Sequence, residues 1–85
     1  MYNVVFTRQA AKSLRKIPPN VANTIRENLA QLALDPFAKY LNATKLQNRP
    51  GYRLRVGDWR VSYETQKEQL VIRVLKIAQR GEVYR

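Results

Sequence analysis

The chain has 85 residues, which fit one small domain, and 45% of them are hydrophobic, enough for a thin core. The absence of cysteine and histidine excludes disulfides, thiol nucleophiles, Cys/His zinc sites and imidazole acid–base catalysis. Lysine and arginine number 16 against 6 acidic residues, and the net charge of +10 indicates an anionic partner, such as nucleic acid, an acidic protein or a membrane surface.

A short strand and two helices are predicted for the first half of the chain. Residues 2–6 form a β-prone run, and Thr7 can cap a helix that extends to about Lys16. The Pro18-Pro19 pair ends this helix and can lie at the start of the next one. The Asp35-Pro36 pair then ends the second helix.

The second helix is recognised by an apolar stripe at helical spacing. The stripe consists of Val21, Ile25, Leu29 and Leu32. Residues 37–44 are expected to form a loop from which three side chains pack inward. These are Phe37, Tyr40 and Leu41.

The second half of the chain changes to a period of two, which is typical of strands. We expect a weak strand over residues 45–48 and stronger strands over 52–56, 59–64 and 70–78, with turns at Gly57-Asp58 and 66–68. The order of elements predicts one α+β domain, residues 1–85, in which an N-terminal strand and a two-helix hairpin pack on an antiparallel sheet of the later strands.

The turn at Gly57-Asp58 sets the register of the hairpin, so that Arg55 lies opposite Arg60 and Arg53 opposite Ser62. The two faces then differ in character. One face holds Tyr52, Leu54, Val56, Trp59, Val61 and Tyr63, and the other holds Arg53, Arg55, Arg60, Ser62 and Glu64. The apolar face is the natural surface for the helices.

The arginines on the second face predict an anion site. Like charges directly opposed across a strand pair cost roughly 0.2–1 kcal/mol, so Arg55 facing Arg60 makes sense if an anion lies between them. Guanidinium groups match phosphate in bidentate geometry and stay charged at ordinary pH. The alternative is a solvated polar face that Glu64 or Glu82 neutralises.

Two further groups of residues extend the candidate site. The last strand can bring Arg80 and Tyr84 near the sheet, where Tyr84 could stack on a base or exchange a proton; the alternative is a frayed tail. Lys12 and Arg15 belong to a basic stripe on the first helix, which could steer RNA or seat an acidic partner, or could be an ordinary solvated face. The six acids show no spacing that suggests metal ligation.

Two sequence blocks carry a resemblance to a known family. The segment YRLRVGDWRVSYE, followed by LVIRVLKIAQRGEVYR, resembles the RelE family of bacterial toxins from type II toxin–antitoxin pairs, and the order of elements agrees over nearly the whole chain. The resemblance implies an endoribonuclease that cleaves messenger RNA, usually in the ribosomal A site, by metal-independent attack of a 2′-hydroxyl and without a cofactor.

The resemblance also implies roles for individual residues. The family's two basic residues on one strand match Arg53 and Arg55, its arginine on the next strand matches Arg60, and its late arginine and terminal tyrosine match Arg80 and Tyr84. The expected catalytic set is Arg55, Arg60, Arg80 and Tyr84, and the expected RNA-binding set is Arg53, Arg85, Lys12 and Arg15. Many relatives carry lysines at the two strand positions and histidine where this chain has Gln79, which affects the assignment of proton transfer.

The implied partners are messenger RNA, the 70S ribosome and a cognate antitoxin with an acidic, partly disordered segment. The N-terminus carries no signal peptide and no apolar run has the length of a membrane span, so we expect a monomeric, cytoplasmic protein of a bacterium or archaeon with no membrane partner. Two alternatives remain: a toxin of the ParE branch, which poisons DNA gyrase, or a binder of RNA or ribosomes with weakened catalysis.

Overall fold

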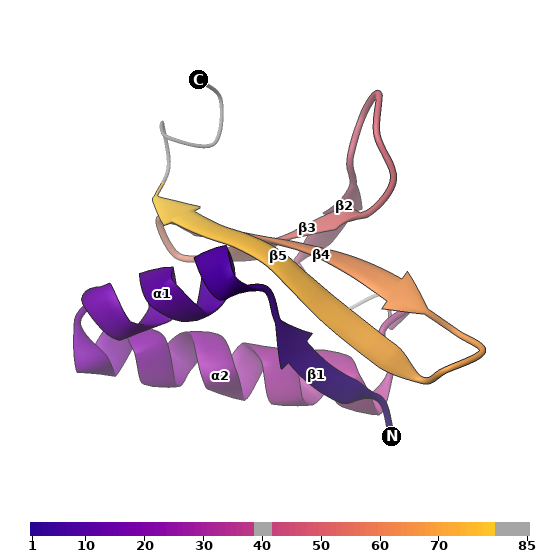
Figure 1. Ribbon diagram of the computed structural model, residues 1–85, viewed down its shortest axis with the longest axis horizontal. Helices are drawn as coiled ribbons and strands as arrows, with labels where there is room; N and C mark the ends of the chain where they lie inside the picture. The colour runs from indigo at the N-terminus through magenta and orange to yellow at the C-terminus, as the bar shows by residue number, and fades with distance from the viewer. Residues whose placement is uncertain (39–41, 80–85) are drawn as a thin grey trace.

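The structure is a computed structural model that describes residues 1–38 and 42–79, which form two helices and five strands. In chain order the elements are β1 (Asn3–Phe6), α1 (Arg8–Lys16), α2 (Pro19–Leu34), β2 (Ala43–Lys45), β3 (Tyr52–Val56), β4 (Trp59–Gln66) and β5 (Val71–Gln79). Both helices lie on one side of the sheet (Figure 1). The predicted α+β fold, with a helical hairpin packed on a sheet, is confirmed.

The sheet has the strand order β1-β5-β4-β3-β2. The strands from β2 to β5 pair antiparallel with their neighbours, as predicted, whereas β1 pairs parallel with β5. The sheet is therefore mixed rather than wholly antiparallel. Because a parallel pair requires a crossover connection, β1 and β5 are joined through all the elements that lie between them in the chain.

The helices begin and end where the sequence predicts. The Thr7 hydroxyl accepts a hydrogen bond from the amide of Ala10 at 3.1 Å, which caps α1, and donates to the carbonyl of Leu75 on β5 at 2.8 Å. Ile25, Leu29 and Leu32 of the α2 stripe are at most 2% exposed. In the described part of the chain, neither helix is long and apolar enough to cross a membrane.

The segment between α2 and β3 differs from the prediction. The strand lies at Ala43–Lys45, earlier than the predicted 45–48, because residues 46–51 form the connection back to β3. Within this connection the amide of Leu46 donates to the carbonyl of Gly51 at 3.0 Å. Phe37 does not pack inward: it is 48% exposed, and the Nζ of Lys67 lies 4.8 Å from its ring centroid. Tyr40 and Leu41 lie outside the described residues.

The core contains a buried tyrosine whose hydroxyl has no partner. Tyr63 is 1% exposed, and its ring stacks on Tyr52 with the centroids 5.6 Å apart. Its hydroxyl makes no hydrogen bond with any described residue. Burial, followed by the interaction with Tyr52, raises the pKa of Tyr63 to about 12. The hydroxyl therefore costs stability instead of adding to it.

We expect Tyr63→Phe to raise the free energy of unfolding at neutral pH by about 1 kcal/mol, since an unsatisfied buried polar group costs about 1–3 kcal/mol. The raised pKa adds a pH dependence: the unfolded chain loses the tyrosine proton near pH 10, before the folded chain does near 12, so the wild type loses stability as the pH rises through this window. Urea titrations at several pH values measure both effects. Equal alkaline slopes for the two proteins, without a gain at neutral pH, would contradict this account.

Candidate functional site

The β3–β4 hairpin places two arginines directly opposite each other. Its turn is Gly57-Asp58, with Gly57 at a φ of 59°, a conformation that glycine adopts without a Cβ penalty. From this turn the register runs as predicted, with Arg55 opposite Arg60 and Arg53 opposite Ser62. The hairpin derived from the sequence is confirmed.

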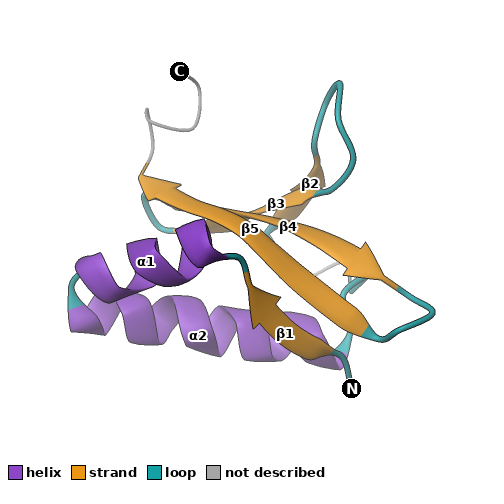
Figure 2. Ribbon diagram, in the orientation of Figure 1, coloured by secondary structure: helices purple, strands orange, loops and turns teal. Residues whose placement is uncertain are grey.

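The two faces of the hairpin also divide as predicted. Leu54, Val56, Val61 and Tyr63 are at most 7% exposed beneath the helices. The opposite side of the sheet, called the open face from here on, carries Arg53, Arg55, Arg60, Ser62 and Glu64. α2 lies on the other side of the sheet (Figure 2), and α1 packs beside β5.

Arg60 is held in place by the backbone of the turn. Its side chain is only 7% exposed, and its Nη1 donates to the carbonyls of Gly57 at 3.2 Å and Trp59 at 3.1 Å. These bonds fix the position of the guanidinium, and the N–H donors of Nε and Nη2 take no part in them. Arg60 is therefore a fixed cation at the turn, and not the solvated side chain that an open polar face would carry.

The other two arginines of the hairpin are more accessible. Arg55 is exposed and Arg53 is half-buried. Glu64 lies opposite Arg73 on β5, four residues along β4 from Arg60, which is about 13 Å at the rise of a strand. Glu64 therefore does not neutralise the Arg55–Arg60 pair; Glu82 lies outside the described residues.

Two basic residues of the open face were missed by the sequence analysis. Ser62 pairs with Lys76 but Tyr63 pairs with Val74, so Leu75 is an extra residue that forms a bulge in β5. The bulge reverses the alternation and puts Lys76 on the same face as Arg73. The sequence did hold a signal for this face: Arg73 and Lys76 are three positions apart and are flanked by apolar residues on both sides. Among the described strand residues, the open face thus carries five cations and one carboxylate: Arg53, Arg55, Arg60, Arg73, Lys76 and Glu64.

The remaining predicted residues are not brought to this cluster by the described structure. Lys12 and Arg15 are exposed on α1. Arg80, Tyr84 and Arg85 lie outside the described residues. Across residues 1–38 and 42–79, no three His, Cys, Asp or Glu side chains lie together in a group that could hold a metal ion.

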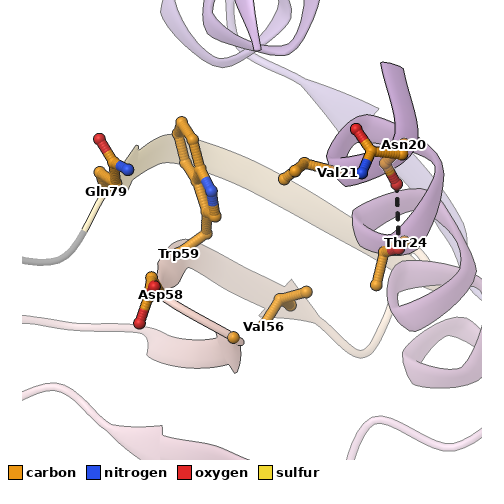
Figure 3. Close-up of a pocket in the computed structure, with 8 residues that line it drawn as sticks. Asn20, Val21, Thr24, Val56, Asp58, Trp59 and Gln79 are labelled. Carbon is orange, nitrogen blue, oxygen red and sulfur yellow. Dashed lines mark hydrogen bonds between the residues drawn. The ribbon is translucent and has the colours of Figure 1, made fainter. Parts of the chain in front are cut away.

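A hollow of about 330 Å³ lies on the helix side of the hairpin turn, between the turn and the start of α2. Figure 3 shows the Trp59 ring standing between Gln79 and Val21, with Asp58 at the turn. The described lining includes a carboxylate and no lysine or arginine. The described lining of this hollow therefore offers no cation to a phosphate, whereas the open face offers several.

Comparisons with known proteins agree with this fold. A family model described as "ParE toxin of type II toxin-antitoxin system, parDE" matches residues 4–84. The protein RelE1 of Methanocaldococcus jannaschii is 27% identical over 86 residues, which cover 99% of this chain and 96% of the relative. The archaeal RelE–RelB complex from Pyrococcus horikoshii is similar with a TM-score of 0.79 and 30% identity, covering 94% of this chain and 96% of that one. The isolated E. coli RelE toxin gives a TM-score of 0.79 at 25% identity, covering 99% and 92%.

Proposed function

The chain belongs to the family of ParE toxins of type II toxin–antitoxin systems, and from this premise we propose that it is a RelE-type endoribonuclease that cleaves messenger RNA on the ribosome. A toxin of RelE type is supported by the identity to RelE proteins over nearly the full length of the chain. Cleavage of messenger RNA in the A site would stop translation in the cytoplasm.

The observation that carries the proposal is the Arg55–Arg60 pair on the open face. Two arginines in direct cross-strand register repel each other, and Arg60 is in addition buried and fixed by the carbonyls of Gly57 and Trp59. A cation held in advance beside a second cation supports stabilisation of negative charge that develops during a reaction. A phosphate between the two guanidinium groups would offset their repulsion.

The proposed chemistry uses a nucleophile that the substrate itself supplies. The 2′-hydroxyl loses its proton as its oxygen attacks the neighbouring phosphorus. The bond from phosphorus to the 5′-oxygen breaks, that oxygen takes up a proton, and the products carry a 2′,3′-cyclic phosphate and a 5′-hydroxyl. Arg55, Arg60 and Arg80 stabilise the charge on the phosphoryl oxygens. Tyr84 orients the 2′-hydroxyl or transfers a proton, because arginine is a poor base. No metal or cofactor takes part.

The RNA-binding residues divide by their position. Arg53 lies next to the pair on β3, where it can hold an adjacent phosphate, and Arg85 adds a charge near Tyr84 in sequence. Lys12 and Arg15 are exposed on α1, where their charge can attract RNA or the ribosome.

A cognate antitoxin is the second partner that we propose. The similar structures include a RelE–RelB complex from Pyrococcus horikoshii, and the net charge of +10 favours an acidic segment that folds on binding. Such a segment would lie over Arg53, Arg55 and Arg60 and exclude RNA from the open face. Without it the free toxin is a monomer.

One observation favours a second candidate function. The family model that matches the chain is described as a ParE toxin. The ParE branch is the one that acts on DNA gyrase. Gyrase inhibition needs a binding surface and no ordered catalytic cation. The buried and hydrogen-bonded Arg60 is therefore what distinguishes the two candidates in the described structure.

The test is controlled expression of the full chain in bacteria without its antitoxin. We expect incorporation of labelled methionine to stop within minutes, while chromosomal DNA stays intact. Gyrase-linked DNA breaks with protein synthesis continuing at first would support the ParE candidate instead. Normal growth with abundant soluble, folded protein would contradict the toxin assignment.

A further inference from the structure

A second hollow, of about 310 Å³, lies on the open face beside the arginine pair. Its volume is at the lower end of the roughly 300–1,000 Å³ of small-ligand sites. The connection between β2 and β3, which rises above the sheet in Figure 1, forms one wall with Leu46, Arg49 and Pro50. Ser62 and Lys76 form the floor, and Leu75 and Gln9 complete the lining.

The lining combines three chemical features. Among the described residues of the lining there are two cations, Arg49 and Lys76, and no carboxylate. Ser62 is 8% exposed, and its hydroxyl makes no hydrogen bond with another described residue. Apolar surface comes from leucine and proline side chains on two sides. The apolar side chains of such a site can contact the face of a flat ring. A hydroxyl and an amide can form hydrogen bonds with the polar edge of the ring, and the two cations can bind one phosphate.

We propose that this hollow binds one nucleotide of the RNA chain, with the base inside it and the phosphate between Arg49 and Lys76. Single-stranded RNA is read in this way, by bases that leave the stack and bind through their edges and faces. The inference rests on the proposed function only in taking RNA as the ligand.

Position along the strand connects the hollow to the arginine pair. Ser62 lies two residues from Arg60 on the same face of β4, a separation of about 7 Å at the rise of a strand. The nucleotide in the hollow is therefore a neighbour of the scissile one. The bulge at Leu75 creates the site, because it turns Lys76 toward this face.

The wall of the hollow is a restrained segment of backbone. Asn48 has a φ of 64° and Gly51 a φ of 109°, and a Cβ at Gly51 would lie 2.8 Å from the carbonyl oxygen of Tyr63. Residue 51 must therefore be glycine for the connection to sit this close to β4. The wall is in place before a ligand arrives.

The test is titration of the labelled, full-length protein with nucleoside 5′-monophosphates, followed by NMR of the backbone amides, with ribose 5-phosphate as the ligand that lacks a base. We expect saturable shifts at residues 46–49, 62, 75 and 76, and binding of ribose 5-phosphate at least tenfold weaker. Arg49→Ala should weaken binding about tenfold, whereas Arg26→Ala, the same loss of charge on an exposed position of α2, should leave it unchanged. Ser62→Val, which fills the floor and suits a strand, should also weaken it.

Other results would decide between the base site and the proposed ribonuclease function. Shifts confined to Arg53, Arg55 and Arg60, or equal binding of ribose 5-phosphate, would overturn the base site and leave the ribonuclease proposal standing. Base-dependent binding in the hollow by a protein that cleaves no RNA would support the site and contradict the proposed function. Because binding is measured without cleavage, the two failures are distinguishable.

Discussion

Arg60→Ala is expected to lower the rate of messenger RNA cleavage by about 10²–10³-fold, the scale for losing one preorganised donor to a developing charge. The variant should also lose about 1–2 kcal/mol of stability. The buried guanidinium donates to the carbonyls of Gly57 and Trp59, and those bonds disappear. The repulsion between Arg55 and Arg60, which the sequence predicts, would alone leave the stability of the Arg60→Ala variant unchanged or slightly higher. The loss of the two hydrogen bonds outweighs this effect.

Single-turnover cleavage on ribosomes, corrected for the folded fraction from a thermal melt, separates the two effects. Arg26→Ala on α2 is the matched control and should cleave at the wild-type rate. Arg60→Lys should recover only part of the activity, because lysine keeps the charge but lacks the planar fork. If folded Arg60→Ala cleaved normally, Arg60 would serve only to fix the hairpin turn.

Tyr84→Phe is expected to lower cleavage by about 10²–10⁴-fold, the usual range for general acid–base catalysis. The substitution keeps the ring and removes the hydroxyl, and the chain has no histidine or cysteine to move the proton instead. Tyr84→Ala should be only slightly worse if the hydroxyl does the chemistry. Cleavage rates under single-turnover conditions and RNA affinity are both measured for the two variants.

The alternative for Tyr84 gives a different pair of results. If the ring only stacks on a base, Tyr84→Phe should behave like the wild type and Tyr84→Ala should lose roughly 1–3 kcal/mol of RNA binding. Unchanged cleavage by Tyr84→Phe would remove this residue from the chemistry and leave proton transfer to the ribosome.

The hairpin at the centre of the site could be predicted because its signals are local. The turn at Gly57-Asp58 sets the register, and a strict alternation of apolar and basic residues sets the faces, so that Arg55 opposite Arg60 follows by counting. The cap at Thr7 and the helix break at Pro18-Pro19 depend in the same way on neighbouring residues. These features need no knowledge of the rest of the fold.

The features that could not be predicted depend on contacts between distant segments. The bulge at Leu75 arises where β5 must serve both β4 and the start of α1, whose Thr7 hydroxyl binds the Leu75 carbonyl. The burial of Arg60 depends on how its side chain folds back over the turn, which alternation does not describe. The parallel pairing of β1 with β5 joins the two ends of the described fold.

The structure also shows where basic residues lie that the sequence alone could not place. Lys12 and Arg15 belong to one basic stripe in the sequence, and both are exposed on α1 in the structure. Strict alternation along β5 would place Lys76 among the core residues. In the structure it lies on the open face and lines the hollow beside Ser62.

The central claim is that this chain cleaves RNA by attack of the neighbouring 2′-hydroxyl on phosphorus. The direct test uses translating ribosomes that carry two messenger RNAs, identical except for one 2′-deoxynucleotide immediately before the mapped cut. We expect the all-ribose message to be cut within a codon, leaving a 5′-hydroxyl on the downstream fragment, and the substituted message to stay intact at that position. Cleavage of the deoxy-substituted message at the same position, or downstream fragments that carry a 5′-phosphate, would contradict the claim.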